Sequence, residues 1–195
     1  MKPRISLRQS LQDPNLLGGA LTGESWAAWR TLLVASMGES LTEDERATFR
    51  ALTGRDREPL QRVDQFAAVI GRRGGKSRAM ATLACYLAGL CDHTDALVPG
   101  ERGVLLCVAL DQRVAKIILD YAEASFERSP ILKQLIASRT ADALELTNGH
   151  YLGGPPGVVP QTAWPHVHRR HRRRACLLVC GRGLRKSGHR GLERG

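Results

Sequence analysis

The chain has 195 residues, of which 43% are hydrophobic and 25% are charged, and its formal net charge at pH 7 is +10. This composition can bury a core and excludes a chain that is disordered throughout. The start has no apolar stretch long enough for a signal peptide, and the longest apolar run, Ala79 to Cys91, is too short to span a bilayer. Three of the five cysteines lie in apolar runs, which is typical of reduced thiols. We therefore expect a cytoplasmic protein with no membrane partner.

The positive charge is concentrated near the carboxyl end of the chain. Residues 150–195 contain nine Arg, one Lys and one Glu, so they carry +9, and residues 1–149 carry only +1. Five of the six His also lie in residues 150–195. The basic character therefore belongs to the tail, and it does not by itself predict a nucleic-acid-binding surface on the rest of the chain.

Residues 1–60 are predicted to form an arm followed by two helices. Breakers such as Gly18-Gly19 favour an extended arm over residues 1–25. Apolar residues at helical spacing predict a helix over residues 24–36. The hydroxyl of Thr42, followed by three acidic residues, predicts the capped start of a second helix that ends at Gly54. The sequence thus predicts an N-terminal helical extension.

Residues 61–149 are predicted to form an α/β core. Short apolar runs predict strands over residues 66–70, 103–110 and 144–147. Longer patterns predict helices over residues 76–90 and 111–126. This alternation of strands and helices is typical of a parallel sheet with helical crossovers.

A glycine-rich segment joins the first predicted strand to the first helix of this core. Its residues are Gly71, Arg72, Arg73, Gly74, Gly75, Lys76 and Ser77. Gly74 and Gly75 would let backbone N–H groups approach phosphates, and Lys76 would reach the β- and γ-phosphate oxygens. The Ser77 hydroxyl would ligate Mg²⁺. The sequence predicts a loop that binds ATP and Mg²⁺; a chance Gly-Lys-Ser turn, and a solvated surface position for Arg73, are the alternatives.

The loop differs from the common form G-x-x-x-x-G-K-[ST], because Gly71 lies one position late and is followed by arginine. A loop of the type Gly-Arg-x-x-Gly-Lys-Ser resembles the Walker A loop of bacteriophage large terminases, in which the early basic residue also faces the phosphates. Arg72 would have that role. Further segments are similar to that family in order and spacing: Trp26 to Phe49, Pro99 to Glu101, Val104 to Ala109, Gln112, Ala115 and Ser129-Pro130. The resemblance covers residues 1–149.

The resemblance implies an incomplete P-loop NTPase fold of the RecA-like type, with a parallel sheet and flanking helices. It also implies part of an ATP-hydrolysing motor that packages double-stranded DNA in the host cytoplasm and carries a separate nuclease domain. The partners implied are double-stranded DNA, the small terminase subunit, the portal protein and further copies of the same chain. Two alternatives stay open: another small P-loop NTPase, and a basic nucleic-acid-binding protein whose tail is genuine.

The family pattern breaks after Gly149. Terminases place an apolar strand ending in Asp-Glu after the third strand, where the Asp orders Mg²⁺ and the Glu orients the attacking water. This chain has HVHRRHRRR at His166 to Arg174 instead, so no catalytic residue is retained. Reading the codons one base later from His150 permits a sequence containing YIAVIADE, in which the codons of Arg173 and Arg174 supply Asp and Glu. We therefore expect a frameshift near Gly149, an inactive fragment, and an out-of-frame tail, residues 150–195, without regular structure.

Overall fold

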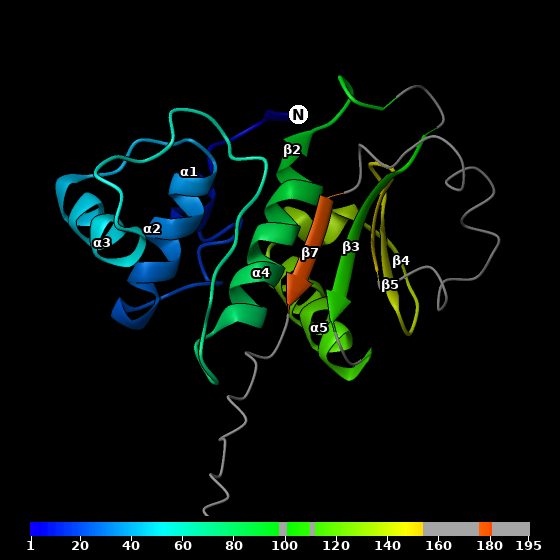
Figure 1. The fold of residues 1–195 in the computed structure, drawn as a ribbon. Coiled ribbons are helices and arrows are strands. Elements are labelled where there is room, and N and C mark those ends of the chain that lie inside the picture. The colour runs from blue at the N-terminus through cyan, green and yellow to red at the C-terminus, as the bar shows by residue number, and fades with distance from the viewer. Residues whose placement is uncertain (98–100, 110–111, 154–175, 181–195) are drawn as a thin grey trace, which may run out of the picture.

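A computed structural model describes residues 1–97, 101–109, 112–153 and 176–180 of the chain. The architecture is mixed α/β, with a group of N-terminal helices beside a sheet that two longer helices cover (Figure 1). Within the described ranges, no helix combines the length and the apolar character needed to cross a membrane.

The N-terminal helices begin and end where local signals place them. They are α1 (Leu7–Gln12), the 3-10 turn η1 (Glu24–Trp26), α2 (Ala27–Ser36) and α3 (Glu43–Thr53). The Thr42 hydroxyl accepts a hydrogen bond from Glu45 N, and Gly54 ends α3 with φ +69°. The predicted helices over residues 24–36 and after Thr42 are thus confirmed.

Helix α1 differs from the prediction, which expects an extended arm over residues 1–25. A capping box between Ser6 and Gln9 begins the helix, and the buried side chain of Leu7 faces the core. The Arg8 guanidinium forms a 2.7 Å ion pair with Glu45 and so joins α1 to the start of α3. Just before α1, the short strand β1 (Lys2–Pro3) pairs antiparallel with β2 (Cys91–Asp92).

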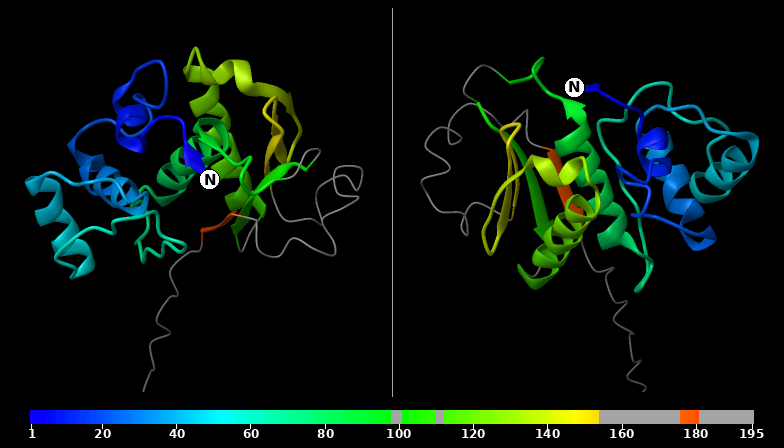
Figure 2. Two further views of the ribbon diagram at one scale, coloured as in Figure 1. Left: turned by 90° about the horizontal axis from the view of Figure 1, so that it is seen from above. Right: turned by 180° about the vertical axis from the view of Figure 1, so that it is seen from behind.

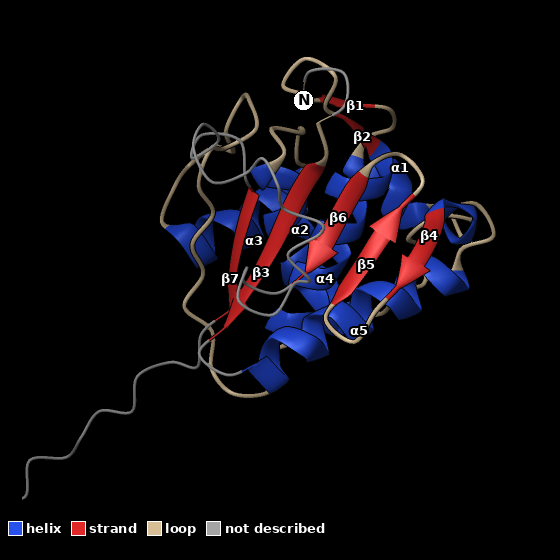
Figure 3. Ribbon diagram, turned by 90° about the vertical axis from the view of Figure 1, so that its right-hand side faces the viewer, coloured by secondary structure: helices blue, strands red, loops and turns tan. Residues whose placement is uncertain are grey.

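Two helices pack against each other and cover one face of the sheet, as Figures 2 and 3 show. Helix α4 (Lys76–Cys85) continues into a π-helical turn, η2 (Tyr86–Leu90), and α5 is Gln112–Arg128. Small side chains let the helices approach: a Cβ on Gly89 would lie 3.2 Å from Phe126. The 3-10 turn η3 (Leu132–Leu135) follows α5. The helices predicted over residues 76–90 and 111–126 are confirmed.

The main sheet has five strands in the order β4-β5-β6-β3-β7. Their bounds are β3 (Gly103–Ala109), β4 (Ile136–Arg139), β5 (Ala143–Leu146), β6 (His150–Gly153) and β7 (Cys176–Cys180). Strand β3 is parallel to β6 and β7, whereas β5 is antiparallel to both β4 and β6.

The prediction of a parallel sheet is therefore wrong for its β4-β5-β6 part. The connections from β4 to β5 and from β5 to β6 are too short for the helical crossover that parallel neighbours need. Gly149, at φ +82°, completes the turn between β5 and β6. The pair Asn148-Gly149 between two apolar runs is itself a hairpin signal. The predicted core ends at Gly149, so the two runs are not predicted to pair as strands.

The two faces of the sheet differ in what they bury. Leu105, Leu152 and Leu144 stand in register on neighbouring strands and belong to the main buried cluster with the helices. The alternate residues Val104 and Tyr151 belong to a second, smaller cluster. The main cluster also contains Leu7 and Leu33 from the N-terminal helices, so the buried core is continuous across the predicted boundary at residue 60.

The strand predicted over residues 66–70 does not form. These residues lie in neither a helix nor a strand, and the Val69 side chain is 100% exposed. Figures 1 and 2 show the segment running alongside α4, on the side of the N-terminal helices. Val63 N donates to Ser36 O at 2.9 Å. An apolar run becomes a strand only where a neighbouring ladder accepts its backbone groups, and here the segment lies apart from the sheet.

Two described strands fall in the stretch that was expected to lack regular structure. Strand β6 begins at His150, and β7 adds to the far side of β3. The other residues of the predicted tail lie outside the described ranges.

Candidate functional site

The predicted phosphate loop lies at the start of α4. Gly71 to Gly74 are exposed, and Gly74 N donates to Gly71 O at 3.4 Å. Gly75 adopts the left-handed conformation, with φ +76° and ψ +3°, and is the N-cap residue of α4 without a side-chain cap. Lys76 and Ser77 are then the first residues of the helix. The turn thus places the lysine and the serine at the positive end of the helix dipole.

Two tryptophans support the loop from the side of α2. Trp29 Nε1 donates a 2.7 Å hydrogen bond to Gly74 O. A Cβ on Gly75 would lie 2.7 Å from two ring carbons of Trp26. Glycine is therefore needed at position 75 for two reasons, the positive φ and the close approach of an aromatic ring. The helical spacing over residues 24–36 does not reveal that Trp26 and Trp29 pack on the loop.

The loop also shows backbone strain at a cation. Arg73 has φ +60°, the one positive value among the non-glycine residues in the part of the chain that the structure describes. Such a conformation is uncommon for a long side chain and costs about 1 kcal/mol. Both Arg72 and Arg73 are exposed, which suits a solvated surface position for Arg73 as well as a contact with a phosphate.

A fourth cation, which the sequence reading missed, adjoins the loop. The Arg78 guanidinium lies 5.0 Å from the centroid of the Trp26 ring and donates to Gly19 O at 3.3 Å. Across the described ranges, no carboxylate forms an ion pair with Arg72, Arg73, Lys76 or Arg78. The start of α4 therefore carries excess positive charge, which favours an anion.

The side chains available near Ser77 determine how a metal ion could be bound there. Within the described ranges, no group of three His, Cys, Asp or Glu side chains could hold a metal ion. Mg²⁺ commonly binds through few protein ligands together with phosphate oxygens and water. A Ser77 hydroxyl at the start of the helix fits that mode. His166 to Arg174, where the family would place the Asp-Glu pair, lie outside the described residues.

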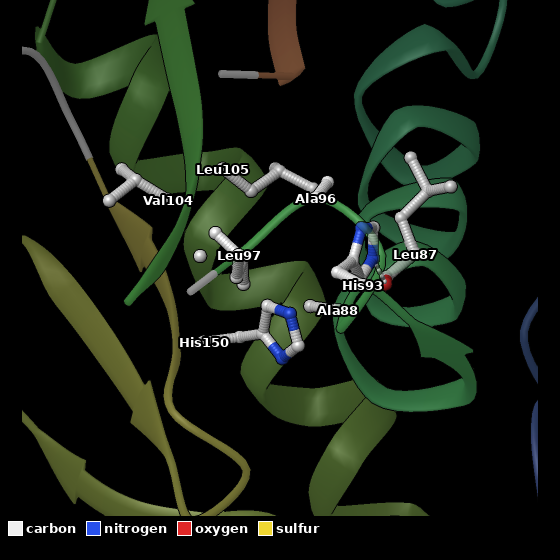
Figure 4. A pocket seen from close by; sticks show the side chains of 9 residues that line it. Leu87, Ala88, His93, Ala96, Leu97, Val104, Leu105 and His150 are labelled. Carbon is white, nitrogen blue, oxygen red and sulfur yellow. Dashed lines mark hydrogen bonds between the residues drawn. The ribbon is translucent and has the colours of Figure 1, made fainter. Parts of the chain in front are cut away.

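A separate small cavity of about 50 Å³ lies at the opposite end of the α4–η2 helix (Figure 4). His93 Nε2 is 2.9 Å from Leu87 O, and the rings of His93 and His150 meet edge to face at 4.9 Å. Both ring nitrogens of His150 are buried, and neither has a hydrogen-bond partner among the described residues. Burial lowers the pKa of His150 to about 4, with a smaller effect from His93. No sequence signal pointed to this cavity.

Comparison of the chain with protein-family models, with curated proteins and with solved structures finds no match. Any function assigned to the chain therefore rests on the geometry of the loop and on the chemistry of its residues.

Proposed function

We propose that residues 71–77 bind the phosphates of ATP together with Mg²⁺. The supporting observation is the turn at Gly75, which leads directly into α4 and sets Lys76 and Ser77 on its first turn. In such a loop the helix N-terminus attracts the phosphates, and the mobile ammonium of Lys76 pairs with their outer oxygens. Arg72 would add a second cation over the triphosphate, and Ser77 would contribute a hydroxyl to Mg²⁺.

We further propose that the chain is the amino-terminal part of a large terminase, the ATP-driven motor of viral DNA packaging. This part rests on the resemblance of the loop Gly71 to Ser77 and of the segments around it. Its partners would then be double-stranded DNA, the small terminase subunit, the portal protein and other copies of the chain. Without the Asp-Glu pair in this reading frame, bound ATP would not be hydrolysed.

Nucleotide binding by the full chain tests the loop. The affinity for ATP with Mg²⁺, measured by calorimetry, should fall by at least about tenfold in Lys76→Ala, because the loop loses a charge-assisted contact. Lys133→Ala, at an exposed lysine of η3, is the matched control and should bind as the wild type does. Equal affinity of the wild type and Lys76→Ala would refute the ATP-binding loop. ATP hydrolysis by the wild-type chain would refute the expectation that the catalytic Asp-Glu pair is missing.

The strand β7 favours a second candidate, a nucleic-acid-binding protein with a genuine basic tail. Residues 176–180 pair with β3 along five positions and follow a run of arginines. A genuine tail would give DNA affinity that falls steeply with salt, since each phosphate contact releases counterions. Replacing Arg169, Arg170 and Arg172 with Gln should then reduce that salt dependence. An unchanged dependence would rule this candidate out.

A further inference from the structure

Two arginines line a cleft of about 300 Å³ between the N-terminal arm and helices α4 and α5. The arm contributes residues from Pro14 to Ala20, α4 contributes Arg78, and α5 contributes Tyr121, Ser125 and Arg128. A volume of this size lies at the lower end of the range for small-molecule sites.

Two guanidinium groups meet at one glycine of this cleft. Arg78 Nη2 donates to Gly19 O at 3.3 Å, and Arg128 Nη2 would lie 3.2 Å from a Cβ placed on Gly19. Both cations therefore lie against the same residue. Like charges brought together repel unless a counter-charge lies between them.

No carboxylate provides that counter-charge. Neither Arg78 nor Arg128 belongs to an ion pair in the part of the chain that is described, and none of the residues lining the cleft is acidic. Among the acids of α5, Asp120 and Glu123 pair with Arg139, and no ion pair between Glu127 and either arginine is formed within the described residues. The two charges are thus available to a ligand.

The walls of the cleft are held in place before any ligand binds. The Ser129 hydroxyl donates to Asn15 O at 2.5 Å, which fixes the arm to the end of α5. The Arg78 guanidinium is held by the Trp26 ring as well as by Gly19. The Arg78 side chain, which these contacts already hold, therefore loses little entropy when a ligand binds.

We infer that this cleft binds a phosphate dianion, either free phosphate or the terminal phosphate of a small phosphomonoester, at Arg78 and Arg128. A phosphate monoester carries a charge of about −1.5 to −2 at pH 7, which matches two guanidinium groups better than a carboxylate or a DNA phosphodiester does. Arginine suits this ligand because its planar fork donates two parallel hydrogen bonds to phosphate oxygens. Arg78 also adjoins the proposed ATP loop, but the second cation of the cleft comes from α5, and phosphate binding there does not require ATP binding at the loop.

Calorimetric titration of the full chain with inorganic phosphate tests the site, with Arg128→Gln as the main variant. Arg128 is exposed and has no ion pair to lose, so this variant should fold, and its affinity for phosphate should fall by at least about tenfold. Arg57→Gln, at another exposed arginine, is the control and should bind as the wild type does. Arg128→Lys should retain part of the affinity, because the charge stays while the fork is lost.

Three measurements separate this site from its rivals. The wild-type affinity for inorganic phosphate should rise as increasing pH converts the phosphate monoanion into the dianion. Phosphate binding that is lost in Lys76→Ala, while Arg128→Gln binds as the wild type does, would place the ion in the ATP loop and overturn the inference. Binding of a short DNA duplex at Arg128 with no binding of inorganic phosphate would also overturn it.

Discussion

The indole of Trp29 donates its hydrogen bond to the carbonyl of Gly74, at 2.7 Å, and so ties helix α2 to the loop that begins α4. The two residues are 45 positions apart in the chain. Because the loop is otherwise exposed from Gly71 to Gly74, this bond is a principal restraint on its conformation.

Trp29→Phe should loosen the loop while keeping most of the packing. We expect a loss of about 1 kcal/mol in the free energy of unfolding, since one partly buried carbonyl loses its donor. The affinity for ATP should fall with it, because the loop would no longer be preorganised. Denaturant unfolding and calorimetry of the same variant measure both effects. An unchanged stability with unchanged ATP affinity would show that the bond does not restrain the loop.

Gly75→Ala should lower the free energy of unfolding more than Gly54→Ala does. Comparing the two variants separates the effect of the positive φ from that of overpacking. Both glycines have positive φ, but a Cβ on Gly54 meets nothing within 4 Å, whereas one on Gly75 would lie 2.7 Å from Trp26. We expect a loss of about 1 kcal/mol for Gly54→Ala, from the backbone alone. Gly75→Ala should lose about 2–4 kcal/mol, because overpacking adds to that cost. Equal losses in chemical denaturation would mean that Trp26 moves aside freely.

The features that sequence reasoning recovered are those with local causes. Helix α3 is an example, because the Thr42 hydroxyl, the acids that come after it and Gly54 specify both ends within the helix itself. The start of α4 was predicted for the same reason, since Gly75 and Lys76 are neighbours in the chain. Apolar periodicity similarly specified α5, which buries Ile118 and Phe126 on one side.

The features that it missed depend on contacts between distant segments. Residues 66–70 have the composition of a buried strand, yet composition does not reveal whether a sheet edge is available to pair with them. The role of Arg78 depends on the approach of Trp26 and Gly19 from other parts of the chain. The positive φ of Arg73 is likewise a property of the folded loop that its sequence does not disclose.

His150→Thr should make the chain less sensitive to acid. The pKa of His150 falls from 6.5 to about 4 through burial, so the unfolded chain takes up a proton at a pH where the folded chain does not. Wild-type stability should therefore decline as pH falls from about 6.5 to about 4. Threonine does not titrate, and it is a residue that the shifted frame permits at this codon. Urea unfolding at several pH values should show the decline reduced in the variant.

His93, whose ring meets that of His150 edge to face, provides an internal control for this experiment. The variant retains His93, so any loss of stability in acid that persists in His150→Thr belongs to groups other than His150. The buried nitrogens of His150 have no hydrogen-bond partner in the part of the chain that the structure describes, and a small β-branched residue suits the start of β6 better. If the variant and the wild type lose stability in parallel over this pH range, His150 is not the group responsible.

Restoring the shifted reading frame should restore an enzyme. Removing one base near the codon for His150 would replace the basic tail by the sequence containing YIAVIADE and would put Asp and Glu at the codons of Arg173 and Arg174. The Asp would then order Mg²⁺ beside Ser77, and the Glu would orient the water that attacks the γ-phosphate. We expect the restored chain, extended to the next stop codon, to hydrolyse ATP, and we expect Lys76→Ala in that chain to abolish the hydrolysis. The nucleotide sequence through the codon for Gly195 should be determined before this experiment. Only some choices of the third base in the present codons encode the Asp-Glu pair in the shifted frame. A restored chain that binds ATP without turnover would show that the proposed frame does not supply the catalytic residues.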